Sequence, residues 1–68
     1  MNYRIHAENP FQRVQACHAT PESALKALQV LMYVSRKDRD RALERLKQGK
    51  PARLVYGFCE GTITPEAK

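Results

Sequence analysis

The middle of the 68-residue chain, residues 22–48, contains no glycine or proline, and residues that begin and end helices flank it. Thr20 can cap a helix with its hydroxyl, and Pro21 stands where no backbone hydrogen-bond donor is missed. Gly49 and Pro51 follow, and this order is typical of a helix end. These features predict helical structure from near Pro21 to about residue 48.

The helical region can form one long helix or two shorter ones. Ser35 and Asp38 have the spacing of a capping box, in which the first side chain accepts a hydrogen bond from a backbone N–H at the start of a helix. One continuous helix could not fold back onto a short sheet. We therefore expect a break between Ser35 and Asp38, followed by a second helix that runs to about Gln48.

The first of these helices is apolar over about 220° of its circumference. Its apolar residues are Ala24, Leu25, Ala27, Leu28, Val30, Leu31, Met32 and Val34. So wide an arc needs the sheet on one side and a second apolar surface on another, which the second helix or another copy of the chain can supply. A homodimer through the first helix is therefore one prediction. Tyr33 is predicted to lie on the polar side of this helix.

Alternating polar and apolar residues predict a β-hairpin at the start of the chain. Asn9 and Pro10 suit the first two positions of a type I turn. If Asn9 lies opposite Gln12, the apolar side chains of both strands share one face and oppositely charged side chains pair. The resulting pairs are Ala7 with Val14, Ile5 with Ala16, Tyr3 with His18 and Glu8 with Arg13.

A third strand is expected at residues 52–63, where Tyr56 and Phe58 continue an alternation of apolar and more polar residues. The alternation predicts that both aromatic side chains face the core. Gly57 and Gly61 interrupt the pattern and indicate a bulge or a close approach of the backbone to another element.

The chain is therefore predicted to be a single α+β domain at residues 1–64, with a flexible tail at residues 65–68. Its elements would follow the order ββααβ, with a three-stranded antiparallel sheet and both helices on one face. A chain of this length has a thin core. Its hydrophobic fraction of 43%, with 28% charged residues, is nevertheless ordinary for a folded domain.

The net charge of +5 is concentrated in residues 36–53. This segment holds eight of the twelve lysines and arginines: Arg36, Lys37, Arg39, Arg41, Arg45, Lys47, Lys50 and Arg53. Against them stand three acids, Asp38, Asp40 and Glu44. The segment therefore carries the whole net charge, and the positive and negative residues of the remaining chain cancel.

Lys37, Arg41 and Arg45, here called the basic stripe, are four residues apart and share one face of the second helix. With Lys50 and Arg53 they predict a surface that binds phosphates or carboxylates. The leading hypothesis is a non-enzymatic module that binds nucleic acid through salt-sensitive contacts, or associates with nucleic-acid machinery. The competing interpretation is a solvated helix that simply carries these charges.

A second hypothesis is a protein-binding module. It would be an inhibitor or adaptor, as small phage or plasmid accessory proteins are, and would dock on an acidic partner or in the nucleic-acid channel of a larger machine. Such a module needs the same positive charge together with apolar anchors. Tyr33 and Phe11 are the candidate anchors.

The sequence predicts neither an enzyme nor a cofactor. The nitrogen and sulfur ligands are His6, Cys17, His18 and Cys59, and they lack the spacing of a metal site, so no metal is expected. A metal-free ribonuclease that uses His6 or His18 with nearby arginines is a minor alternative. Without an apolar run that suits a signal peptide or a membrane span, the chain is expected in the cytoplasm, with both cysteines as free thiols.

Overall fold

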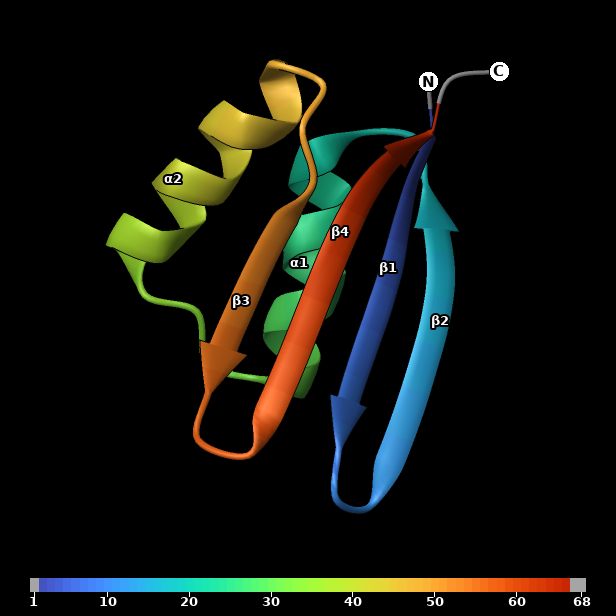
Figure 1. The fold of residues 1–68 in the computed structure, drawn as a ribbon, viewed down its shortest axis with the longest axis vertical. Helices are drawn as coiled ribbons and strands as arrows, with labels where there is room; N and C mark the ends of the chain where they lie inside the picture. Colours follow the sequence, from blue (N-terminus) through green and yellow to red (C-terminus); the bar gives the residue numbers. More distant parts are fainter. Residues whose placement is uncertain (1, 67–68) are drawn as a thin grey trace.

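Two helices and four strands follow one another in the order ββααββ in the computed structural model, which describes residues 2–66 (Figure 1). The elements are β1 (Asn2–Asn9), β2 (Gln12–His18), α1 (Pro21–Leu31), α2 (Arg36–Lys47), β3 (Ala52–Tyr56) and β4 (Cys59–Glu66). The strands form one antiparallel sheet in the order β2-β1-β4-β3. The α+β class is as predicted, and the sheet has one strand more than predicted.

The segment predicted to be one third strand is two strands joined by a tight turn. β3 ends at Tyr56 and β4 begins at Cys59, so Gly57 and Phe58 form the turn between them. Gly57 has a φ of +60°, a left-handed conformation that glycine adopts without steric cost. A glycine with positive φ at the first central position is typical of a type II′ hairpin turn. The turn glycine therefore decides where the chain reverses.

The β1–β2 hairpin has the predicted register. Asn9 lies opposite Gln12, and Ile5 lies opposite Ala16. The Oδ1 atom of Asn9 accepts a hydrogen bond of 2.8 Å from the backbone N–H of Phe11, a local bond typical of asparagine in turns. This turn places Phe11 at the tip of the hairpin.

β4 extends further than predicted. Pro65 and Glu66, which the sequence predicts to be part of a flexible tail, are its last residues and pair with the beginning of β1. The carboxylate of Glu66 also lies 3.2 Å from Nε of Arg4 in an ion pair. Both residues therefore belong to the sheet. Residues 67 and 68, the remainder of the predicted tail, lie outside the described residues.

The helical region is divided where the capping spacing predicts. α1 ends at Leu31, and a linker at residues 32–35 leads to α2. The Ser35 hydroxyl accepts a hydrogen bond of 3.1 Å from the backbone N–H of Asp38 and caps α2. Tyr33 consequently lies in the linker, and its predicted place on the polar side of the first helix is wrong.

The outer ends of the helical region are also as predicted. At the start of α1, Oγ1 of Thr20 accepts a hydrogen bond of 3.2 Å from the backbone N–H of Ser23. After α2, Gly49 has a φ of +79°, which suits the left-handed residue that commonly terminates a helix. These ends depend on side chains and backbone conformations within a few residues of each other.

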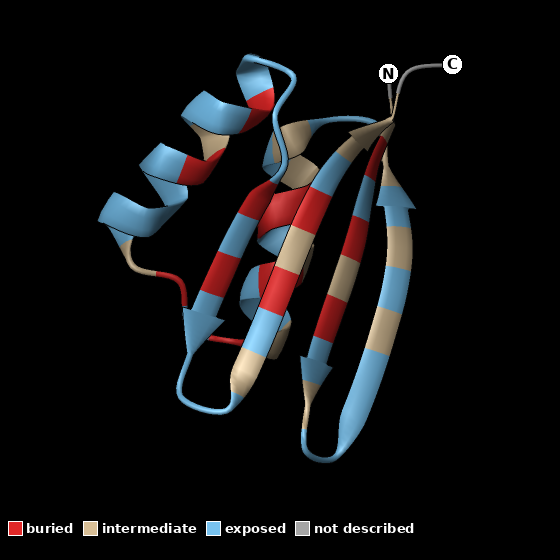
Figure 2. Ribbon diagram, viewed as in Figure 1, coloured by how far each residue is buried: buried red, intermediate tan, exposed pale blue. Residues whose placement is uncertain are grey.

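The core lies between the helices and one face of the sheet (Figure 2). Its fully buried large side chains are Ile5, Leu25, Leu28, Leu46 and Ile63. α1 contacts β1, β2 and β4, whereas α2 lies beside the edge strand β3 and also contacts α1. The sheet and α2 of the same chain therefore supply the two surfaces that the apolar arc of the first helix needs. Of that arc, Val30 alone is exposed.

The prediction that Tyr56 and Phe58 face the core is wrong. Their side chains are 56% and 88% exposed. The inward positions of β3 are filled by Ala52 and Leu54. Tyr56 has the same position as Leu54 in the alternation, but it is the last residue of β3 and its ring packs against the ring of Tyr33 in the linker. Phe58 lies in the turn, where no helix covers it.

Candidate anion-binding site

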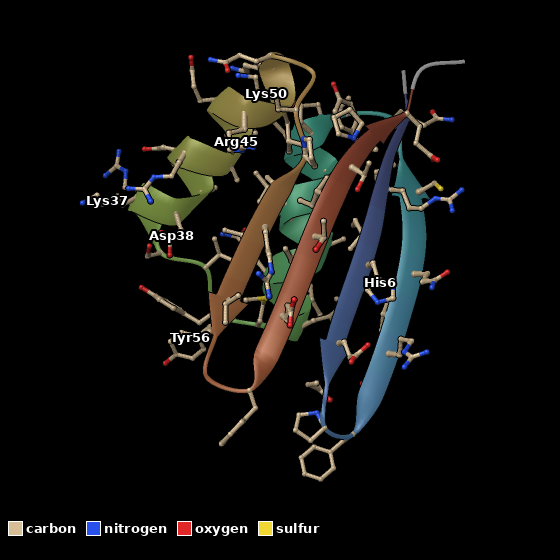
Figure 3. All side chains as sticks on the ribbon, viewed as in Figure 1. His6, Lys37, Asp38, Arg45, Lys50 and Tyr56 are labelled. Carbon is tan, nitrogen blue, oxygen red and sulfur yellow. The ribbon has the colours of Figure 1, made fainter. Side chains whose placement is uncertain are left out.

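The basic stripe on α2 is exposed along its whole length. Lys37, Arg41 and Arg45 are all exposed, and Figure 3 shows Lys37 and Arg45 on successive parts of the helix. With a rise of about 1.5 Å per residue, the stripe is about 12 Å long. Within residues 2–66, none of its three side chains forms an ion pair with a carboxylate. No carboxylate of the described residues therefore pairs directly with a cation of the stripe.

The arginines of the sheet differ from those of the stripe because each has a carboxylate partner. They lie on the face of the sheet that the helices leave uncovered. The ion pairs are Arg4 with Glu66, Arg13 with Glu8 and Arg53 with Glu60. Positive and negative charges on this face therefore balance locally, whereas α2 carries six cations against three acids.

Arg41 and Arg45 line a groove between α2 and the edge strand β3. The groove has a volume of about 290 Å³, and β3 supplies its opposite wall, which includes Val55. Nε of Arg45 donates a hydrogen bond of 2.9 Å to the carbonyl oxygen of Pro51, which fixes the guanidinium beside the groove. A guanidinium has five N–H donors, so the remaining donors can bind an anion.

The structure brings together only part of the predicted site. Arg53 lies on the groove wall with Arg41 and Arg45, but its Nε and Nη2 both donate to the carboxylate of Glu60, the first at 2.9 Å. Lys37 lies in the first turn of α2, and Lys50 lies beyond its last turn (Figure 3). These two lysines therefore extend the positive surface past both ends of the groove.

Three acids interrupt this surface. Asp38 lines the groove, and Asp40 lies 3.9 Å from Arg39 in the one ion pair that an α2 cation forms within residues 2–66. Oε1 of Glu44 accepts a hydrogen bond of 3.4 Å from Gln48. Only one of the three acids thus neutralises a cation of α2, and the helix keeps an excess of positive charge.

Four exposed aromatic side chains lie at one end of the molecule. Both hairpin turns and the α1–α2 linker meet at this end, opposite the marked ends of the chain (Figure 1). This aromatic end comprises Phe11, Tyr33, Tyr56 and Phe58. The predicted anchors Phe11 and Tyr33 are 96% and 63% exposed. The alternation assigns the other two to the core, and Gly57 between them, interpreted as a bulge or a close approach, is the residue that could have indicated the turn.

The histidines and cysteines do not converge on one site. His6 lies on the uncovered face of the sheet, whereas Nδ1 of His18 lies 3.1 Å from the Ser23 hydroxyl on α1. The two histidines therefore lie on opposite faces of the sheet. Cys17 and Cys59 are free thiols in this structure. In the described part of the chain, no three potential ligands are grouped to hold a metal ion.

The sequence matches no protein-family model, and comparisons with curated proteins and with solved structures give no match either. Between residues 2 and 66, no helix combines the length and the apolar character that a membrane span requires.

Proposed function

We propose that the protein is a non-enzymatic module that binds nucleic acid through phosphate contacts of the basic stripe. The observation that carries this proposal is the contrast between the unpaired cations of the basic stripe and the paired arginines of the sheet. An unpaired arginine gives up no carboxylate partner when it binds a phosphate. Each phosphate that it neutralises also releases condensed counterions, which favours binding at low salt.

The spacing of the stripe suits a chain of phosphates. Arg41 and Arg45 lie about 6 Å apart along the helix axis, and Lys37 extends the row to about 12 Å. Phosphates of one strand in a duplex advance by about 3.4 Å per nucleotide along the axis, so the row can follow several of them. Arginine is well suited to this contact because its planar guanidinium can donate two parallel hydrogen bonds to phosphate oxygens.

Two double variants that lose the same charge test the proposal. Arg41→Gln with Arg45→Gln removes two unpaired cations from α2, whereas Arg4→Gln with Arg13→Gln removes two paired cations from the sheet. Fluorescence anisotropy with labelled DNA and RNA oligonucleotides at about 50 mM salt gives the affinity of each variant. We expect the α2 variant to bind about ten-fold more weakly or worse, and the sheet variant to remain close to the unmodified chain.

Absence of binding to both DNA and RNA at low salt would exclude the proposed function. Equal losses of affinity in the two double variants would contradict the placement of the binding site on α2, because the net charge alone would then explain the affinity. All four substituted arginines are exposed, and their replacement should change the free energy of unfolding by no more than about 1 kcal/mol each, the size of one exposed ion pair or hydrogen bond. Circular dichroism and thermal unfolding of both variants check this.

The aromatic end supports a second candidate, docking on an acidic protein. Phe11 and Phe58 lie in turns and make no contribution to the core, and exposed aromatic residues are typical anchors of protein interfaces. The charge of α2 would then steer the association. A complex with a defined protein that survives nuclease treatment, and that Phe11→Ala or Phe58→Ala disrupts, would favour this candidate over nucleic-acid binding.

A further inference from the structure

Tyr33 and Tyr56 form an aromatic pair beside the start of α2. Their ring centroids lie 5.2 Å apart and their planes are inclined by 56°, within the range favoured by paired aromatic rings. One ring comes from the linker and the other from the end of β3. Both residues are nevertheless more than half exposed. The pair therefore holds two elements together and keeps ring surface on which another ring can stack.

This aromatic pair lies at the N-terminal end of the basic stripe. Tyr33 comes shortly before the first residue of α2, and Lys37 lies in the first turn. In Figure 3, Tyr56 lies below the beginning of the helix that carries Lys37 and Asp38. A ligand whose phosphates follow the stripe in this direction therefore meets the two tyrosines at its end.

Aromatic rings beside a row of cations distinguish single-stranded from double-stranded nucleic acid. In a duplex the bases stack on one another, so an exposed side chain contacts mainly the phosphates. In a single strand the base faces are free to stack on aromatic side chains, and this contact tolerates any base because every base has a π face. A positively charged track combined with exposed rings is the arrangement that single-strand binders use.

We infer that the ligand of the basic stripe is single-stranded nucleic acid, with Tyr33 and Tyr56 stacking on its unpaired bases while Arg41 and Arg45 bind its phosphates. This inference rests on the proposed function and adds the class of nucleic acid to it. It also depends on an observation that reverses the sequence prediction, namely that Tyr56 is exposed beside α2 and is not part of the core.

The test measures binding to the same oligonucleotide in two forms. A labelled oligonucleotide of about 12 nucleotides, within the range of site sizes known for small single-strand binders, is used alone and annealed to its complement. DNA and RNA versions of both forms are titrated at one salt concentration. We expect the single strand to bind about ten-fold more tightly than the duplex, in DNA, in RNA or in both.

Variants of the tyrosines separate stacking from packing. Tyr33→Leu with Tyr56→Leu keeps apolar side chains at both positions but removes the aromatic faces. This variant should bind the single strand about ten- to hundred-fold more weakly and the duplex unchanged. Tyr33→Phe with Tyr56→Phe keeps the faces and should bind like the unmodified chain. Phe11→Leu is the matched control, since it removes an exposed ring from the β1–β2 turn, which lies across the sheet from β3.

Two outcomes would overturn the inference and leave the proposed function in place. One is equal affinity for single strand and duplex, with the leucine variant unimpaired and the Arg41→Gln, Arg45→Gln variant still weakened. The other is an equal loss of affinity in the Phe11→Leu control, which would indicate that an exposed ring far from the stripe contributes as much as the tyrosine pair. Absence of binding to either form would remove the inference and the proposed function together.

Discussion

Leu28 of α1 packs directly against the backbone of Gly61 in β4. A Cβ atom added at Gly61 would lie 2.6 Å from Cδ1 and 3.0 Å from Cδ2 of Leu28. Leu28 is fully buried, so its side chain has little room to move away. The missing side chain in β4 therefore allows α1 to approach one of the two central strands of the sheet.

Gly61→Ala should destabilise the protein by about 1–3 kcal/mol, because an added methyl group overpacks this contact. Thermal unfolding should show a midpoint lower by several degrees, since about 1 kcal/mol corresponds to about 4–8 °C in a domain of this size. Thr64→Ala, an exposed position in the same strand, is the control and should have a much smaller effect. If Gly61→Ala is as stable as the unmodified chain, Leu28 must be able to rearrange.

Ser35→Ala should lower the free energy of unfolding by about 1 kcal/mol, because it removes the hydroxyl that accepts the hydrogen bond from Asp38 at the start of α2. Urea unfolding should show a lower midpoint with an unchanged slope, which indicates a change of stability without a change of exposed surface. Ser35→Asp supplies another good capping side chain and should restore most of the loss. A fully stable alanine variant would contradict a capping role.

Asp38→Asn should strengthen nucleic-acid binding, because it removes a negative charge from the groove lined by Arg41 and Arg45. An increase of about two- to five-fold at low salt is expected for an exposed charge, and screening should reduce it as the salt concentration rises. The same change should cost about 0.3–1 kcal/mol of stability, since Asp38 lies in the first turn of α2.

Glu22→Gln is the matched control for the Asp38 prediction. It changes the net charge by the same amount and also removes a first-turn carboxylate, but on α1. The free energy of unfolding should fall by a similar amount in Glu22→Gln as in Asp38→Asn. The affinity for nucleic acid, measured by fluorescence anisotropy, should stay unchanged. Equal gains of affinity in the two variants would show that the groove is not where the ligand binds.

The salt dependence of the affinity should report how many phosphates the basic stripe neutralises. For a single strand, the logarithm of the affinity falls against the logarithm of salt with a slope of about −0.7 per neutralised phosphate. Arg41→Gln with Arg45→Gln should therefore reduce the magnitude of the slope by about 1.4 between about 50 and 200 mM salt. The Arg4→Gln, Arg13→Gln variant should retain the original slope, and a reduction there would contradict the proposed interface.

The β1–β2 hairpin and the helix boundaries could be predicted because their signals are local. Asn9 and Ser35 each accept a hydrogen bond from a backbone N–H two or three residues away. The division of residues 52–63 into two strands was missed for a different reason. Alternation of apolar residues indicates which face of a strand a side chain lies on, but it does not indicate where the strand ends. Leu54, Tyr56 and Phe58 alternate without interruption across the turn at Gly57, so the pattern resembles one strand.

The candidate site could be predicted where it follows helical spacing, and not where it depends on contacts between distant segments. The exposed face shared by Arg41 and Arg45 follows from their separation along α2. The engagement of Arg53 by Glu60 appears only when β3 and β4 pair. The meeting of Tyr33 with Tyr56 likewise requires the linker and the strand end to be positioned by the rest of the fold.

The central strands β1 and β4 come from opposite ends of the described chain, with Asn2 paired to Glu66. The two hairpins and the helices can form quickly from nearby residues. Joining the hairpins into one sheet, however, closes a loop of almost the whole chain, which costs conformational entropy and slows folding. Until that closure, each hairpin has an unpaired edge at which a second chain can add. The speed of folding and the resistance to aggregation therefore depend on the one strand pair that no local sequence signal specifies.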